Sequence, residues 1–166
     1  MLPPKLILAP VDFSPHANEA LKVAADLAKR FGSELCLVHV VPFIPKLPSA
    51  STIFNEREYE EELHKSADVR LKEIGDEIAR SGVTVTTRVG TANEVGQEIL
   101  LTAEHVHADL IVIASHGMTG WSRLAFGSVA DKVTRLATCP VLLLPMQPKE
   151  QRSESVAGQD SVAVSR

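Results

Sequence analysis

The sequence has few cysteines, no surplus of basic residues and no long apolar run. Its two cysteines, Cys36 and Cys139, each lie within an apolar run, and neither belongs to a zinc-ligand spacing pattern. These positions exclude a disulfide scaffold and a structural zinc site. Lys and Arg number 17 against 21 Asp and Glu, a formal net charge of -4, which makes nucleic acid a poor candidate partner. The longest apolar runs are about strand length, far below the roughly 20 residues of a membrane span.

The chain is expected to form one cytoplasmic domain. Met1 is followed by Leu-Pro-Pro rather than by a charged and then apolar leader, which favours the cytoplasm. The 166 residues, 45% of them hydrophobic, fit a single domain, which we place at residues 1–146. Beyond Pro145 the sequence becomes polar, so residues 147–166 are predicted to be a disordered tail.

Short apolar runs alternate with stretches of helical periodicity along the chain. Ser14 and Pro15 are a good N-cap and first helical residue, Gly90 is expected to turn the chain, and Asn93 is expected to cap the next helix. Residues 42–55 are predicted to form a loop. The predicted strands cover residues 6–11, 35–41, 83–89, 109–114 and 139–144, and the predicted helices cover 15–31, 56–81, 94–105 and 129–137.

This alternation predicts an α/β fold, a five-stranded parallel sheet in the order 3-2-1-4-5 with helices on both faces. In such a sheet, ligands bind beyond the carboxyl ends of the strands at the switch point. The first and fourth strands flank that crevice. They end in Pro10-Val11-Asp12 and Ala114-Ser115-His116-Gly117, which are the first candidate site residues.

Two glycines, Gly117 and Gly127, enclose nine residues, and Gly127-Ser128 opens the last helix. The N–H groups at a helix N-terminus attract anions, and glycine allows their close approach. Backbone groups of Gly127, Ser128 and Val129 can therefore cradle phosphates. An ordinary helix cap with ordinary turns explains the same spacing.

The stretch Ala114-Ser115-His116-Gly117-x9-Gly127-Ser128 resembles the G-x2-G-x9-G-(S/T) signature of the universal stress protein (UspA-like) family, in its ATP-binding branch. The likeness extends over residues 5 to 145, from the strand ending in Val11-Asp12-x-Ser14 to the closing Cys139-Pro140-Val141 strand. The family implies a Rossmann-like fold of the adenine nucleotide alpha hydrolase kind, a homodimer and bound ATP.

The resemblance also implies residue roles. Pro10, Val11 and Asp12 would lie along the adenosine, with the Asp12 carboxylate accepting hydrogen bonds from ribose hydroxyls. Val41 and Ala114 would contact adenine, and Ala114 departs from the signature because it replaces the first glycine. The phosphates would be held by Gly117, Gly127, Ser128 and Val129.

Three histidines and an arginine have both a functional and an ordinary structural explanation. His116 and Arg123 lie in the loop and can reach a phosphate, although an exposed side chain is the simpler explanation of each, most of all for His116. His105 and His107 have an H-x-H spacing, which interaction with a helix dipole explains without a metal. We predict no metal ligands and no catalytic residues.

The resulting hypothesis is a nucleotide-dependent regulator in the stress response, binding ATP with Mg²⁺ or Mn²⁺ held mainly by the phosphates. The sequence has no G-x4-G-K-(S/T) lysine and no carboxylate cluster near the motif, which indicates slow hydrolysis at most. Two alternatives stay open: a slow ATPase or phosphotransferase using His116 or Ser128, and a stress-response dimer that binds no nucleotide. A homodimer is expected through the fifth strand, because Val141–Leu144 is an apolar edge.

Overall fold

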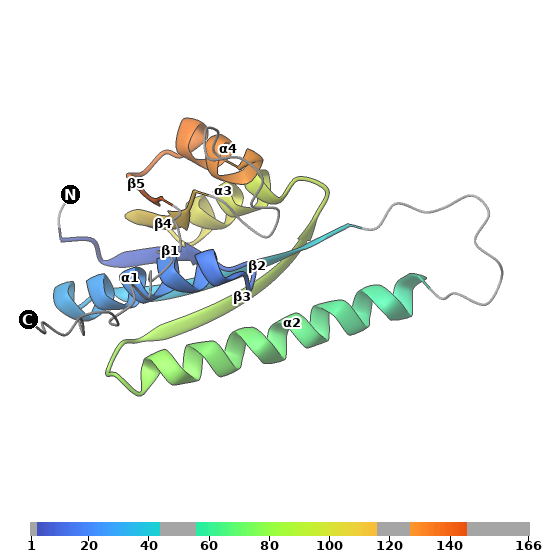
Figure 1. Ribbon diagram of the computed structural model, residues 1–166, viewed down its shortest axis with the longest axis horizontal. Helices are drawn as coiled ribbons and strands as arrows, with labels where there is room; N and C mark the ends of the chain where they lie inside the picture. The colour runs from blue at the N-terminus through green and yellow to red at the C-terminus, as the bar shows by residue number, and fades with distance from the viewer. Residues whose placement is uncertain (1–2, 44–55, 116–126, 146–166) are drawn as a thin grey trace, which may run out of the picture.

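The computed structural model describes residues 3–43, 56–115 and 127–145 (Figure 1). Strands and helices alternate along these residues, as the hydrophobic patterns predict. The strands are β1 (Leu6–Pro10), β2 (Glu34–Pro42), β3 (Val85–Ala92), β4 (Leu110–Ala114) and β5 (Val141–Leu144). The helices are α1 (Pro15–Phe31), α2 (Glu56–Ala79), α3 (Val95–His105) and α4 (Ser128–Leu136).

The five strands form one parallel sheet in the order β3-β2-β1-β4-β5, which confirms the predicted fold and strand order. β1 is central, and Leu8 pairs with Cys36 on one side and Ile111 on the other. The chain leaves β1 toward β2 and returns to add β4 on the other side. This reversal places the switch point at the carboxyl ends of β1 and β4.

Each face of the sheet carries two helices, and the alternation of side chains along the strands divides the core between them (Figure 1). Ile7, Leu35 and Val112 pack with α1 and α2. Their neighbours Leu8, Cys36 and Ile111 pack with α3 and α4 on the opposite face. All of these side chains are at most 1% exposed. The central strands are therefore apolar throughout because both of their faces are covered.

Helix α1 begins and ends where its sequence signals predict. The Ser14 hydroxyl accepts a hydrogen bond from the Ala17 N–H at 3.1 Å, and Pro15 occupies the first helical position. The helix ends at Gly32, whose φ of 68° lies in the left-handed region. The first helix N-terminus beside the switch point is thus capped by its own side chain.

The predictions around β3 and α3 were partly wrong. Gly90 was expected to turn the chain, but it lies within β3, which continues to Ala92. The Glu98 side chain packs closely against it, because a Cβ at residue 90 would lie 3.0 Å from Glu98 Oε1 and 3.1 Å from Glu98 Cγ. Asn93 is not the helix cap either. Glu94 holds that position, without a capping hydrogen bond from its side chain.

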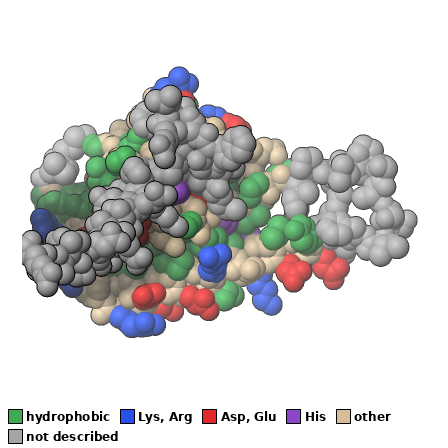
Figure 2. Space-filling view, viewed as in Figure 1, with side chains coloured by type: hydrophobic (Ala, Val, Ile, Leu, Met, Phe, Trp, Pro, Cys, Tyr) green, Lys and Arg blue, Asp and Glu red, His purple; other side chains and the backbone are tan. Residues whose placement is uncertain are grey.

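Helix α2 packs along β2 and β3 through one apolar stripe. Leu71 is fully buried and Ala67 is 6% exposed, as the helical spacing predicts. Figure 2 shows acidic and basic side chains gathered along the lower edge of the molecule, where α2 lies. Within the described residues, no helix combines the length and the apolar character needed to cross a membrane.

Candidate functional site

A cavity of about 410 Å³ opens at the carboxyl ends of β1, β2 and β4, at the switch point. Its volume is in the range of small-molecule sites. It is lined by the end of β1 and the turn after it, by β2, by the end of β4 and the start of α4, and by Val95 and Ile99 of α3. The remaining lining residues are Pro10, Val11, Asp12, Ala17, Val38, His39, Val40, Pro42, Ile113, Ala114, Ser115, Gly127, Ser128, Val129 and Ala130.

The structure brings most of the described candidate residues together in this cavity. They form two groups far apart in sequence, one at the end of β1 and in the turn after it, the other at the end of β4 and the start of α4. Their members are Pro10, Val11, Asp12, Ala114, Gly127, Ser128 and Val129. The candidates His116, Gly117 and Arg123 lie outside the described residues.

Val41 does not line the cavity, whereas its neighbours Val40 and Pro42 do. Successive side chains of a strand point to opposite faces of the sheet. Val40 belongs to the core cluster on the α3 and α4 side, and Val41 is the next residue along the strand. This alternation does not by itself decide the lining, because His39, on the same side of the strand as Val41, also lines the cavity. The contact between Val41 and adenine stays a prediction.

The turn after β1 holds the Asp12 carboxylate at the wall of the cavity. Asp12 Oδ1 accepts a hydrogen bond from the Ser14 N–H at 2.9 Å, which closes a local turn onto the start of α1. The Val11 N–H donates to the Val38 carbonyl at 2.8 Å, so the turn is also tied to β2. A carboxylate fixed in this way is suited to accept hydrogen bonds from a ligand with hydroxyl groups.

Sequence reasoning missed His39, which lines the cavity from β2. Its Nδ1 lies 2.7 Å from the Val11 carbonyl oxygen. Burial lowers the pKa of His39, and this effect outweighs the opposing effects of the Val11 hydrogen bond and the Asp12 charge. The signal available in the sequence was a single histidine within the otherwise apolar run Leu35–Val41.

The N-terminus of α4 borders the cavity, and among the described residues it has no side-chain cap. Its N-cap is Gly127, which makes no capping hydrogen bond, in contrast to Ser14 at the start of α1. The Gly127 N–H donates to the Ser115 carbonyl at 2.9 Å, which ties the start of α4 to the end of β4. The unpaired N–H groups of a first helical turn and the helix dipole favour an anion at this position.

Helix α3 holds α4 in place through an ion pair and through shared core packing. The Lys132 ammonium group on α4 forms an ion pair with the Glu94 carboxylate at the start of α3. Ile99 of α3 and Val133 of α4, each at most 2% exposed, belong to the same core cluster. The two helices that border the cavity therefore pack as one layer.

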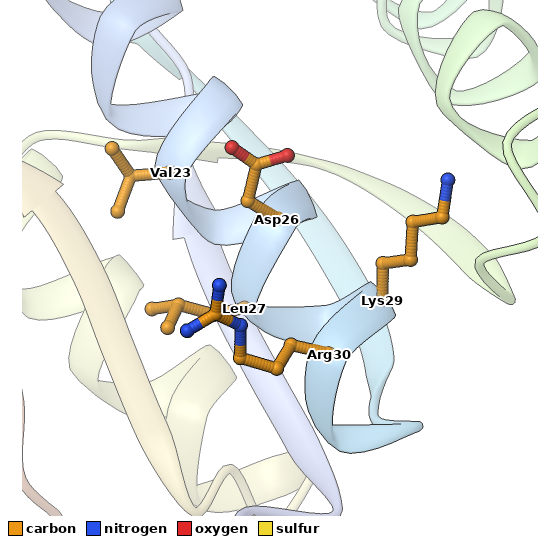
Figure 3. Close-up of a pocket in the computed structure, with 5 residues that line it drawn as sticks. All are labelled: Val23, Asp26, Leu27, Lys29 and Arg30. Atoms are coloured by element: carbon orange, nitrogen blue, oxygen red, sulfur yellow. The ribbon is translucent and has the colours of Figure 1, made fainter.

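A second cavity of about 600 Å³ lies along α1, where Val23, Asp26, Leu27, Lys29 and Arg30 line it (Figure 3). All of these residues come from one helix, and no strand end or helix N-terminus is among the described lining residues. Size alone does not decide between the cavities. The switch-point cavity combines apolar walls, a carboxylate and a helix N-terminus, so it is the candidate site.

Within residues 3–43, 56–115 and 127–145 there is no group of three or more His, Cys, Asp or Glu side chains able to hold a metal ion. The described walls instead offer apolar contact from Val40 and Ile99, hydroxyl recognition by Asp12 and N–H donors at the α4 start. This set of groups fits a ligand with an apolar planar part, hydroxyls and an anionic end.

Comparison with known proteins identifies the family. A sequence profile of the universal stress protein family matches residues 4–145. This chain belongs to the universal stress protein family. Among curated members, universal stress protein MJ0531 of Methanocaldococcus jannaschii is 35% identical over 149 residues, covering 88% of this chain and 85% of that one. Universal stress protein YxiE of Bacillus subtilis is 30% identical, covering 83% and 97%.

Solved structures of the family share the fold. Protein MJ0577, a universal stress protein of M. jannaschii, superposes with a TM-score of 0.74 at 28% identity, covering 87% of this chain and 97% of that one. The universal stress protein from Archaeoglobus fulgidus solved in complex with dAMP has a TM-score of 0.57 at 26% identity, covering 86% and 98%. At least one protein of similar fold therefore binds an adenine nucleotide.

Proposed function

We propose that this universal stress protein binds ATP in the switch-point cavity and acts as a nucleotide-dependent regulator of a stress response. The observation that carries the proposal is the convergence of Asp12, Ala114 and the uncapped start of α4 on one cavity. A mononucleotide needs apolar contact for its base, an acceptor for its ribose hydroxyls and donors for its phosphates. The described cavity offers each of these.

The proposed orientation follows from the positions of these groups. The base lies against the apolar side chains near Val40 and Ile99, the ribose meets the Asp12 carboxylate, and the phosphates point to Gly127, Ser128 and Val129. Ala114 lines the same cavity, where the family signature has glycine. The dAMP complex of the A. fulgidus relative supports an adenine base in this family.

Regulation is favoured over rapid catalysis by the composition of the site. The sequence lacks a G-x4-G-K-(S/T) motif, whose lysine would stabilise the negative charge that develops on a γ-phosphate during transfer. The described lining residues contain one carboxylate, that of Asp12, so a divalent ion would be held mainly by the phosphates. We further propose that the regulator is a homodimer joined through β5.

The proposal is tested by calorimetric titration of nucleotide-stripped protein with ATP and Mg²⁺, beside AMP and GTP. We expect ATP to bind, and Asp12→Ala to weaken it about tenfold or more, because a charged acceptor for the ribose is lost. Asp26→Ala is the matched control. It removes an aspartate from the α1 cavity and should leave the affinity unchanged.

Gly127→Val tests the phosphate end of the same site. The φ of -60° and ψ of 149° at residue 127 suit any residue, so the fold should be retained. A branched side chain would obstruct the approach of a phosphate to the α4 start, and ATP binding should be lost. Flat titrations of the wild-type protein with every nucleotide would refute the proposal and favour a dimer that binds no nucleotide.

A further inference from the structure

The side chains of Arg70, Phe13 and His39 form a chain of contacts from α2 to the wall of the cavity. The Phe13 and His39 ring centroids lie 4.4 Å apart, with an angle of 33° between the ring planes. The Arg70 guanidinium carbon of α2 lies 4.3 Å from the Phe13 ring centroid. Phe13 is thus contacted by an imidazole from β2 and by a cation from α2.

Phe13 has an uncommon backbone conformation. Its φ is 62°, in the left-handed region that non-glycine residues rarely adopt. Such a conformation persists where surrounding contacts determine it. Here the contacts are the ring interactions with His39 and Arg70, together with the packing of Phe13 against the α1 and α2 core.

The His39 hydrogen bond fixes the same turn from the backbone. A carbonyl oxygen only accepts, so the 2.7 Å contact between His39 Nδ1 and the Val11 oxygen requires the proton on Nδ1. One imidazole therefore binds the Val11 carbonyl and contacts the Phe13 ring. Asp12 lies between these two residues in sequence and lines the cavity.

We propose that Arg70, Phe13 and His39 are positioning residues that hold the Val11–Ser14 turn, and with it the Asp12 carboxylate, in the geometry that binds the ligand's hydroxyls. This inference rests on the proposed nucleotide site and adds residues to it. Arg70 is not among the described residues that line the cavity, so it acts through Phe13. Helix α2 thereby contributes to ligand affinity without contacting the ligand.

The test uses matched variants of the full-length chain. His39→Leu removes the donor to Val11, whereas His39→Asn retains an N–H donor near the Nδ1 position. Arg70→Met removes the cation, whereas Arg70→Lys retains it. The controls are His105→Leu, at an exposed position at the end of α3, and Arg57→Met, which removes an exposed ion pair on α2.

Two measurements separate positioning from general destabilisation. The first is the affinity for ATP and dAMP by calorimetry. The second is amide hydrogen exchange without ligand at Ser14, whose N–H is bound by Asp12 Oδ1, and at Leu35, whose N–H donates to the Thr84 carbonyl within the sheet. Nitrogen-15 spectra of the ring add a direct check that neutral His39 carries its proton on Nδ1.

We expect His39→Leu and Arg70→Met to speed Ser14 exchange about tenfold and to weaken nucleotide binding by a similar factor, with Leu35 exchange unchanged. His39→Asn and Arg70→Lys should remain within about threefold of the wild type, and both controls should match it. Unchanged Ser14 exchange in His39→Leu and Arg70→Met would overturn the inference, as would equal acceleration at Leu35.

The outcome is informative even when the proposed function fails. If the wild-type protein binds no nucleotide, the nucleotide site is refuted, but Ser14 exchange still decides whether the three residues hold the turn. Faster exchange at Ser14 alone would support the positioning role. A neutral His39 with its proton on Nε2 would contradict it, because that ring cannot donate to Val11.

Discussion

At the scale of single residues, His39 links the protonation state of the chain to its stability. Burial lowers its pKa, while the Val11 hydrogen bond and Asp12 favour the charged form and Arg70 and His64 oppose it. In the unfolded chain the pKa of a histidine is about 6.5. Between that value and the lower folded pKa, the unfolded state binds more protons than the folded state, so stability falls as the pH falls.

We therefore expect the free energy of unfolding of the wild type to decrease as the pH is lowered through and below about 6.5. His39→Asn should decrease less over the same range, because it has no imidazole to protonate. Urea unfolding at pH 8 and at steps down to pH 5 measures both curves. Parallel curves for the two proteins would show that His39 contributes nothing to the pH dependence.

At the scale of elements, the helices α1 and α4 both start beside the cavity, but their N-termini are capped differently. The Ser14 hydroxyl caps the Ala17 N–H, whereas Gly127 supplies no side chain to α4. The α1 cap thus contributes to stability, and the α4 start is the one suited to a ligand. The same local motif, a strand followed by a turn and a helix, serves two purposes in one fold.

Ser14→Ala is expected to destabilise the protein by about 1 kcal/mol, since a buried cap is lost and the first turn of α1 is left with an unsatisfied N–H. Thermal and urea unfolding measure the change. Ser81→Ala, at an exposed position after α2, is the control and should differ from the wild type by less than about 0.5 kcal/mol. Equal effects of the two substitutions would refute a capping role for Ser14.

At the scale of the whole molecule, the described sheet has an apolar edge at β5. Val141–Leu144 pairs with β4 on one side, and all four of its residues are half-buried. The Pro140 and Leu144 carbonyls accept hydrogen bonds from the N–H groups of Ile111 in β4 and of Ser115 just after it. In a parallel ladder this alternation directs the Val141 and Leu143 N–H groups to the outer edge. Such an edge favours pairing with a second copy.

We expect the wild type to sediment as a dimer and Val141→Pro to weaken that dimer about tenfold or more, because an outward N–H is removed. Proline is tolerated at the first position of a strand, so the fold should persist. Thr91→Pro is the control, because it removes an outward N–H from the opposite edge at β3. A wild type that remains monomeric at high concentration would disprove association through β5.

Much of the fold could be predicted from local pattern. The strand order, the two helical layers and the α1 caps follow from apolar runs, helical spacing and the Ser14-Pro15 and Gly32 signals. Gly90 and Asn93 show where such signals fail. A glycine marks either a turn or a close contact, and only the position of Glu98 decides between them at residue 90.

The candidate site was predictable in part for the same reason. Its described residues follow strand ends or begin α4, so order along the chain was sufficient to bring Asp12, Ala114 and Gly127 together. The β2 residues that line the cavity, among them His39 and Val40, were not predictable to the residue, because the lining depends on how far β2 extends beside β1 and on how the helices pack against the sheet.

The fold class and the main residues at the switch point could be predicted without coordinates, because hydrophobic period and motif spacing are local properties of the chain. Only the tertiary structure decided that His39 binds the Val11 carbonyl, that Arg70 reaches Phe13 and that Val40 rather than Val41 lines the cavity. Contacts between residues 28 and 57 positions apart depend on how the layers pack, and no local pattern specifies that packing.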